Sequence, residues 1–119
     1  MDFKQQLALL GIEGKLYNAY MAALELGQAS VQMVATKANL ERTTAYDLLA
    51  KLEEDGFVRM VDCDGKRRVI AEDPVVMIQR LDQQKRIIDD LLPQLRSIYN
   101  QSKTKPEIRF YEGIEGIKT

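Results

Sequence analysis

Two short clusters of cationic and hydroxyl side chains are the residues of this chain best suited to do chemistry. The first is Arg42-Thr43-Thr44 and the second is Lys66-Arg67-Arg68. Guanidinium, ammonium and hydroxyl groups donate hydrogen bonds to phosphate oxygens, and a helix that begins at the first cluster would add the anion affinity of its N-terminus. The two clusters therefore indicate binding of a phosphate-bearing polymer rather than turnover of a small substrate.

Composition disfavours catalysis. The chain has 119 residues, no histidine and one cysteine, Cys63, so it lacks the commonest general base and the commonest metal ligand. No base, nucleophile and metal site form one constellation, and we interpret the acidic run Glu53-Glu54-Asp55 as a solvated helix end. A redox role for Cys63 is disfavoured because the chain has no second cysteine. We expect no enzyme activity, no cofactor and no metal.

The sequence also lacks the marks of a membrane or secreted protein. No apolar run approaches the roughly 20 residues that cross a bilayer, the N-terminus lacks the pattern of a secretory signal, and a lone cysteine suits a reducing compartment. We therefore expect a cytoplasmic protein without a membrane partner. The net charge is −1. Basic residues nevertheless outnumber acidic ones in segments 30–51 and 59–68, and a local positive patch can steer a polyanion despite an acidic total.

The first cluster opens the second of two predicted helices. Ser30 is a good N-cap for a helix that ends at Ala38, and Asn39 suits the left-handed residue of a tight turn. The next helix covers residues 42–55 and is ended by Gly56. Apolar residues recur in both helices at helical spacing. These inward stripes are Val31, Val34, Ala35 and Ala38 in the first helix, and Ala45, Leu48, Leu49 and Leu52 in the second. Two helices precede them, one with the stripe Phe3, Leu7 and Leu10, and one with Leu16, Tyr20, Ala23 and Leu24 that Gly27 ends.

A hairpin carries the second cluster. Residues 57–61 and 67–71 are rich in β-formers, and residues 62–68 join them, with Asp64-Gly65 as the turn signal. Helix, turn, helix and a basic-tipped hairpin is the order of a winged helix-turn-helix, which places a polar helix face and a basic loop on one side of a small domain. We therefore expect a mainly α fold with a small β-hairpin, whose second helix enters a DNA major groove.

A long helix is predicted from Asp73-Pro74, which is a typical helix start, to about residue 101. Its apolar residues recur at alternating steps of four and three, which is a coiled-coil heptad seam with one polar position, and Pro93 falls opposite the seam. The seam is formed by Met77, Leu81, Gln84, Ile88, Leu91, Leu95 and Ile98. We expect it to be a homodimer interface; the alternative is packing against the first helices of its own domain.

Three segments follow from these patterns. Residues 1–73 are predicted to form the winged helix-turn-helix domain and residues 74–102 the dimerisation helix. Residues 103–119 are predicted to be a linker and the first strand, 107–111, of a truncated or absent effector domain. One strand cannot bury its face alone. We therefore expect either a fragment of a longer regulator or a short regulator without a sensor.

Several strings of the chain resemble the TrmB family of archaeal and bacterial transcriptional regulators, which are often sugar-responsive. These strings are Leu10-Gly11, RTTAYDLL at 42–49, LEEDGFV at 52–58, the basic run at 66–68, Asp73-Pro74, and IRFYEGIEGI at 108–117. The resemblance implies sequence-specific DNA binding as a dimer, with a ligand sensed by a following domain. A small-molecule effector is implied only if that domain exists.

The expected DNA contacts lie in and around the two clusters. They are Ser30, Lys37, Arg42, Thr43, Thr44, Tyr46, Asp47 and Lys51 from the helices, and Lys66, Arg67 and Arg68 from the wing. Each has a plainer interpretation: a solvated helix start at Arg42, a packed ring at Tyr46, solvated lysines, and a solubilising turn at the wing. Strand alternation sends neighbouring side chains to opposite faces, so not all three wing residues can contact DNA.

The leading hypothesis is a homodimeric, sequence-specific DNA-binding transcriptional regulator. Its recognition helix, 42–55, would lie in the major groove, and its wing, 62–68, would contact the flanking backbone or minor groove. The alternative is a winged-helix protein-interaction module that does not read DNA. The small basic patch and the acidic total keep that alternative open.

Overall fold

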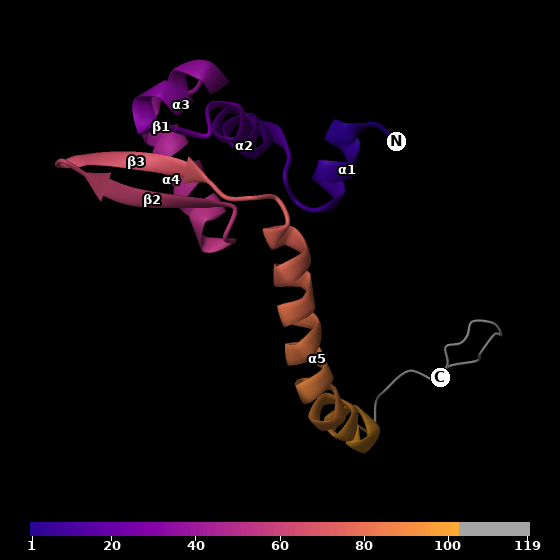
Figure 1. Ribbon diagram of the computed structural model, residues 1–119. Coiled ribbons are helices and arrows are strands. Elements are labelled where there is room, and N and C mark those ends of the chain that lie inside the picture. Colours follow the sequence, from indigo (N-terminus) through magenta and orange to yellow (C-terminus); the bar gives the residue numbers. More distant parts are fainter. Residues whose placement is uncertain (103–119) are drawn as a thin grey trace. The chain divides into compact units, whose positions relative to one another are not determined.

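The structure is a computed structural model that describes residues 1–102. These residues form five helices and a three-stranded antiparallel sheet (Figure 1). In chain order the elements are α1 (Phe3–Leu9), α2 (Gly14–Leu26), β1 (Gln28–Ser30), α3 (Val31–Ala38), α4 (Arg42–Glu54), β2 (Val58–Cys63), β3 (Lys66–Ala71) and α5 (Val76–Gln101). The chain divides into two compact units, Met1–Asp82 and a second that begins at Gln83, so the first turns of α5 belong to the first unit. The predicted fold class, a mainly helical winged helix-turn-helix with a long C-terminal helix, is confirmed.

The ends of α2, α3 and α4 follow from local sequence, as predicted. The Ser30 hydroxyl oxygen accepts a hydrogen bond from the Met33 amide at 3.1 Å and caps α3. Asn39 ends α3 with a left-handed φ of 58°, and Gly27 and Gly56 follow α2 and α4 with φ of 75° and 83°. Glycine adopts such angles without steric cost, and asparagine tolerates them better than most residues. The tight turn between α3 and α4 is therefore encoded at a single residue.

The predicted apolar stripe of α1 is wrong at two of its three positions. Only Leu7 is buried, whereas Phe3 and Leu10 are 57% and 67% exposed. The chain turns after the helix, where Gly11 has a φ of 91°. That turn directs Ile12 into the core instead, where it is 3% exposed.

The sheet has the order β1-β3-β2, with β3 in the centre. Sequence reasoning missed β1, whose three residues pair with Ile70, Val69 and Arg68 of β3. Three residues are too few to show the alternation by which a strand is detected. The short β1 strand ties the start of α3 to the wing strand.

The hairpin turn consists of two residues, not of the seven residues 62–68 that the sequence predicted to join the strands. Asp64 and Gly65 both have positive φ, 52° and 76°, as a type I′ turn requires. The strands then pair at once, with Lys66 opposite Cys63, Arg67 opposite Asp62, and Arg68 opposite Val61. The basic residues of the wing therefore lie on a strand, where the pleat fixes the face that each one occupies.

The core of the first unit lies between α2, α3, α4 and one face of the sheet. In α4, Ala45, Leu49 and Leu52 have no exposed surface. Leu48 and Ala38, both predicted to face inward, are half-buried against this core. The largest fully buried side chains are Tyr20, Leu49, Leu52, Val34, Val58 and Val69.

Helix α5 begins at Val76, two residues later than predicted. The Asp73 carboxylate accepts a hydrogen bond from the Val75 amide at 2.9 Å and holds a turn ahead of the helix. Met77, the first residue of the predicted seam, packs against the core of the first unit together with Val76. No helix within residues 1–102 is long and apolar enough to cross a membrane.

The remaining seam residues are uncovered in the described chain. The five apolar ones, Leu81, Ile88, Leu91, Leu95 and Ile98, are 44–67% exposed, and Gln84 is also exposed. Pro93 lies inside the helix without breaking it. The predicted linker and strand at 103–119 lie outside the described residues.

One polar atom of the core has no hydrogen-bond partner among the described residues. The Tyr20 hydroxyl is fully buried, and its ring packs against Phe57 with centroids 5.6 Å apart. Burial raises the pKa of Tyr20 above its ordinary value because the charged form loses hydration. An unpaired buried hydroxyl costs free energy that the ring contacts must offset.

We predict that Tyr20→Phe leaves the free energy of unfolding unchanged or raises it by up to about 1 kcal/mol, because the substitution removes an unsatisfied donor and keeps the ring. Urea unfolding followed by circular dichroism measures the change. Tyr17→Phe, on the same helix but only half-buried, is the matched control and should have no effect. A loss of more than about 1 kcal/mol in Tyr20→Phe would mean that the hydroxyl is hydrogen-bonded in solution.

Candidate nucleic-acid interface

The start of α3, the start of α4 and the end of the β2–β3 hairpin line one groove of about 520 Å³. Its lining residues are Ser30, Val31, Gln32, Arg42, Tyr46, Asp62, Gly65, Lys66 and Arg67. Five of these were predicted as DNA contacts from the sequence, namely Ser30, Arg42, Tyr46, Lys66 and Arg67. The fold therefore brings the two basic clusters to one place although more than 20 residues separate them in the chain.

Helix α4 presents its polar face to solvent because its apolar stripe packs into the core, fully buried at three of its four positions and half-buried at Leu48. Arg42 and Tyr46 lie one turn apart on the exposed side and reach the groove. The other predicted contacts of α4 do not line the groove. Of these, Thr43, Asp47 and Lys51 are exposed and Thr44 is half-buried.

A contact between Tyr46 and Arg67 joins α4 to the wing. The Arg67 guanidinium lies 6.0 Å from the centroid of the Tyr46 ring, a cation–π distance. The same guanidinium is 3.6 Å from the carboxylate of Asp62, its cross-strand partner. The exposed face of α4 and the basic end of the hairpin therefore share one side of the unit.

Alternation along β3 separates the three basic wing residues, as the sequence predicted. Arg67 lies on the same face of the strand as buried Val69, which is the face toward α4. Arg68 lies on the opposite face, is half-buried, and lines a second hollow together with Gln28, Cys63, Asp64 and Lys66. Lys66, next to the turn, lines both hollows. Arg68 is thus not brought to the α4 groove.

The cations of the groove differ in how far they are already neutralised. Within residues 1–102, Arg42 and Lys66 form no ion pair, whereas Arg67 is paired with Asp62. Lys37 is paired with Glu25, 3.3 Å away, and does not line the groove. Free cations lose no existing partner when they bind a phosphate, so Arg42 and Lys66 are the stronger candidates for such contacts.

Sequence reasoning missed two polar groove residues, Gln32 and Asp62. The side-chain amide of Gln32 donates to the Thr36 hydroxyl at 3.2 Å, so it lies along the exposed side of α3. Gln32 lies two residues after the N-cap Ser30, and this position in the sequence could have indicated that it lies near the groove. For Asp62, the signal was the turn Asp64-Gly65, since a two-residue turn places Asp62 opposite Arg67.

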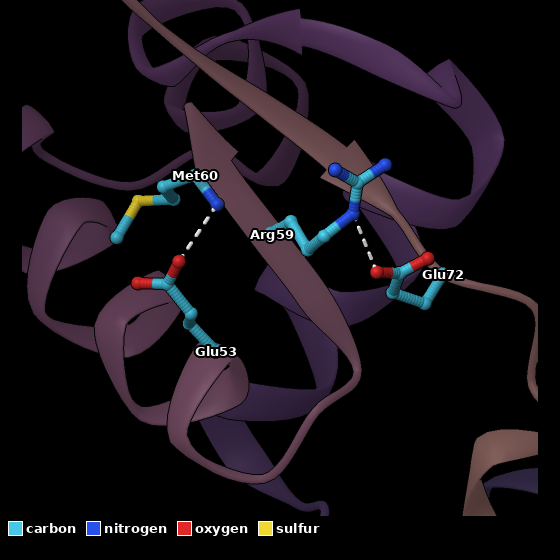
Figure 2. Close-up of polar contacts among 4 residues, drawn as sticks. All are labelled: Glu53, Arg59, Met60 and Glu72. Carbon is cyan, nitrogen blue, oxygen red and sulfur yellow. Dashed lines mark hydrogen bonds and ion pairs between the residues drawn. The ribbon is translucent and has the colours of Figure 1, made fainter. Parts of the chain in front are cut away.

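The sequence suggested that the acidic run at the end of α4 is a solvated helix end. Glu54 is exposed, but Glu53 and Asp55 are half-buried and have partners. The Glu53 carboxylate accepts a hydrogen bond from the Met60 amide of β2 at 2.9 Å (Figure 2). Asp55 forms an ion pair of 3.2 Å with Arg80 of α5. These carboxylates oppose the helix dipole, but each has a partner from a neighbouring element and ties α4 to it.

The described residues contain no group of three or more His, Cys, Asp or Glu side chains that could hold a metal ion. The groove presents cations, a phenol, amide or hydroxyl groups, and one carboxylate, Asp62, which is paired with Arg67. These groups bind anions and hydrogen-bond acceptors. Phosphates and base edges of DNA offer both.

The fold of this chain recurs in solved structures. It superposes on TrmBL2, an archaeal chromatin protein whose structure shows a novel mode of DNA binding, with a TM-score of 0.56 and 22% identity over 72% of this chain and 34% of that one. It superposes on a MarR family transcriptional regulator from Silicibacter pomeroyi with a TM-score of 0.52 and 16% identity, covering 87% of this chain and 66% of that one. For the transcriptional regulator Tm0710 from Thermotoga maritima, the TM-score is 0.52 and the identity 16%, with 86% of both chains covered.

These identities show a shared fold alone. The chain spans about a third of the length of TrmBL2 and 66% of the Silicibacter pomeroyi protein. No curated protein matches the sequence. The sequence pattern of one family, described as the sugar-specific transcriptional regulator TrmB, matches residues 7–74. Because that match covers more than half of its length, this chain belongs to the TrmB family of transcriptional regulators.

Proposed function

We propose that the protein is a sequence-specific DNA-binding transcriptional regulator that acts as a homodimer. Each subunit inserts α4 into a major groove, and the hairpin end at residues 62–68 contacts the flanking backbone or minor groove. Residues 1–73 act as the DNA reader and residues 74–102 as the dimerisation helix. An effector-sensing role for a following domain, of which residues 103–119 would be the start, belongs to the same proposal.

The contact between Tyr46 and Arg67 is the observation that carries this proposal. It places the wing beside the exposed face of α4, with a distance of 6.0 Å between guanidinium and ring centroid. A helix and a wing on one side can contact base edges and phosphates of the same duplex. The unpaired cations Arg42 and Lys66 flank this contact in the shared groove.

The exposed seam of α5 supports the homodimer. Five apolar side chains on one stripe of a single helix would remain wet in a monomer. A second copy of the helix offers the same stripe and can cover it with knobs-into-holes packing. Gln84, the polar position of the seam, would favour one register of the two helices because an unpaired amide in the interface is costly.

We predict that Arg42→Ala and Arg67→Ala each weaken DNA binding. If the side chain contacts a base, the loss of binding free energy should be about 1–3 kcal/mol. If it contacts a phosphate, the slope of log affinity against log salt concentration should fall by about 1. Fluorescence anisotropy measures the affinity for a duplex enriched from a random library, at several salt concentrations. Lys66→Ala should lower the salt slope in the same way, as expected for the loss of a phosphate contact. Arg68→Ala should have the smallest effect of the wing residues because Arg68 lies outside the α4 groove.

Lys15→Ala is the control for this experiment. It removes the same charge from an exposed position of α2 that does not line the groove. Its affinity and salt slope should equal those of the wild type. Absence of binding even at low salt, or equal losses in Lys15→Ala and Arg42→Ala, would contradict the proposal and favour an interaction module that does not read DNA.

We predict that Ile88→Glu dissociates the homodimer. Each dimer would lose two buried isoleucine contacts of about 1.5 kcal/mol or more, which corresponds to a dissociation constant raised by roughly 100-fold or more. Sedimentation equilibrium measures the mass at several concentrations. Gln83→Glu, which adds the same charge outside the apolar stripe, should leave the dimer intact. A wild-type chain that sediments as a monomer at every concentration would refute the assignment of α5.

A further inference from the structure

The groove beside α4 contains one carboxylate that the proposed function does not use. Among the described residues that line this groove, Asp62 is the only acid, and its side chain is 77% exposed. A carboxylate repels phosphate groups, so Asp62 opposes the sequence-independent attraction of DNA to the nearby cations Arg42 and Lys66. A benefit of this residue therefore has to come from a contact other than one with phosphate.

The pleat of β2 holds Asp62 on the groove side of the sheet. Val58, Met60 and Asp62 alternate along one face of the strand, and Val58 is buried in the core. Strand pairing places Asp62 opposite Arg67, whose guanidinium reaches the ring of Tyr46 on α4. This face of the sheet is thus apolar over the core and ends in two opposite charges beside the exposed side of α4.

The Arg67 guanidinium is held on two sides, and its outer edge remains able to donate. Its Nε lies 3.6 Å from Oδ1 of Asp62, and its central carbon lies 6.0 Å from the centroid of the Tyr46 ring. Within residues 1–102, its two Nη groups have no hydrogen-bond partner and the Asp62 carboxylate accepts no hydrogen bond. An ion pair this exposed adds little to stability. What it provides is a set of donors beside an acceptor, both open to a ligand.

The edges of DNA base pairs differ in what they offer to such a pair. An ionised carboxylate can only accept, so the base group that suits it is an exocyclic amino group. In the minor groove, only a G·C pair has one, on guanine N2. In the major groove, a G·C pair places the cytosine N4 amino group beside guanine O6 and N7, the two acceptors that an arginine binds bidentately. From either groove, a donor set beside an acceptor therefore matches a G·C pair best.

We propose that Asp62 and Arg67 form a recognition pair that selects a G·C base pair at the position nearest the hairpin end. Arg67 donates through its Nη groups to acceptors of that base pair, and Asp62 accepts from one of its amino groups. Where no amino group is present, the carboxylate faces only acceptors and phosphates, which repel it, so a mismatched sequence is penalised. Asp62 is thus a specificity-determining residue, and its role rests on the proposed DNA-binding function.

A scan of the enriched duplex tests this pair. Each base pair is changed in turn between G·C and A·T, and the affinities of wild type and Asp62→Asn are measured by fluorescence anisotropy. We expect one position where A·T lowers the wild-type affinity by about tenfold or more, whereas Asp62→Asn loses less than about threefold there. Asp62→Asn should also bind random-sequence DNA more tightly, with a salt slope steeper by up to about 0.9, because one repulsive charge is gone.

Asp64→Asn is the matched control. It removes the same charge from the same hairpin, but Asp64 lines the second hollow and not the α4 groove. Asparagine also tolerates its left-handed φ of 52°. Its base preference should equal that of the wild type. Arg67→Lys keeps the charge but lacks the paired Nη groups, so it should lose the preference for G·C and keep the salt slope.

A modified base identifies the amino group that is recognised. Inosine in place of the selected guanine removes the N2 amino group and leaves the major-groove edge unchanged. A wild-type loss as large as that for A·T assigns the contact to guanine N2, and an unchanged affinity assigns it to cytosine N4. Either result supports the recognition pair if Asp62→Asn has lost the preference.

The outcomes separate the recognition pair from the proposed function. If Asp62→Asn keeps the wild-type preference at every position while both proteins bind DNA, the recognition pair is wrong and the proposed function stands. If the wild-type chain binds no DNA even at low salt, the proposed function is wrong and the recognition pair with it. Circular dichroism melts of Asp62→Asn and Asp64→Asn should match the wild type, because both side chains are exposed.

Discussion

The burial of one stripe of α4 is the constraint on which the rest of the structure depends. Ala45, Leu49 and Leu52 have no exposed surface. Because a helix turns about 100° per residue, Tyr46, Asp47 and Lys51 fall outside this stripe and are exposed. Rotating the helix to bury Tyr46 would bring the two leucines into water, at about 1.5–3 kcal/mol for each side chain. The polar face is thus kept accessible by the core and not by contacts of its own.

The sheet imposes the second constraint, because it decides which basic residue meets α4. Val69 is buried, and the period of two along β3 puts Arg67 on the same face and Arg68 on the other. A slip of one residue would reverse these faces and expose Val69. The pairing of β1 with the same strand fixes the start of α3 beside the hairpin. Strand register therefore decides which basic side chains line the groove.

The carboxylates at the end of α4 link this helix to β2 and to the first turns of α5. Glu53 accepts a hydrogen bond from the Met60 amide of β2, and Asp55 pairs with Arg80 of α5. Residues that weaken the helix end in isolation thus stabilise its attachment in the folded unit.

The sequence by itself determined the helices, their caps and the tight turns, because these depend on neighbours in the chain. Ser30, Asn39, Gly56 and Asp64-Gly65 each specify a local backbone geometry, and all adopt it. The stripes of α3 and α4 were also readable, since helical periodicity shows which side is apolar. The exposed face of α4 and the heptad pattern of α5 followed from the same periodicity.

Only the tertiary structure decided which of the candidate residues come together. The three-residue strand β1 depends on a partner more than 35 residues away, so its own residues carry no signal of it. Contacts between distant segments decide which of Arg67 and Arg68 faces α4. They also pair Lys37 with Glu25 and give Glu53 and Asp55 their partners. Local propensity specifies which elements form, whereas burial and strand register specify which side chains share a surface.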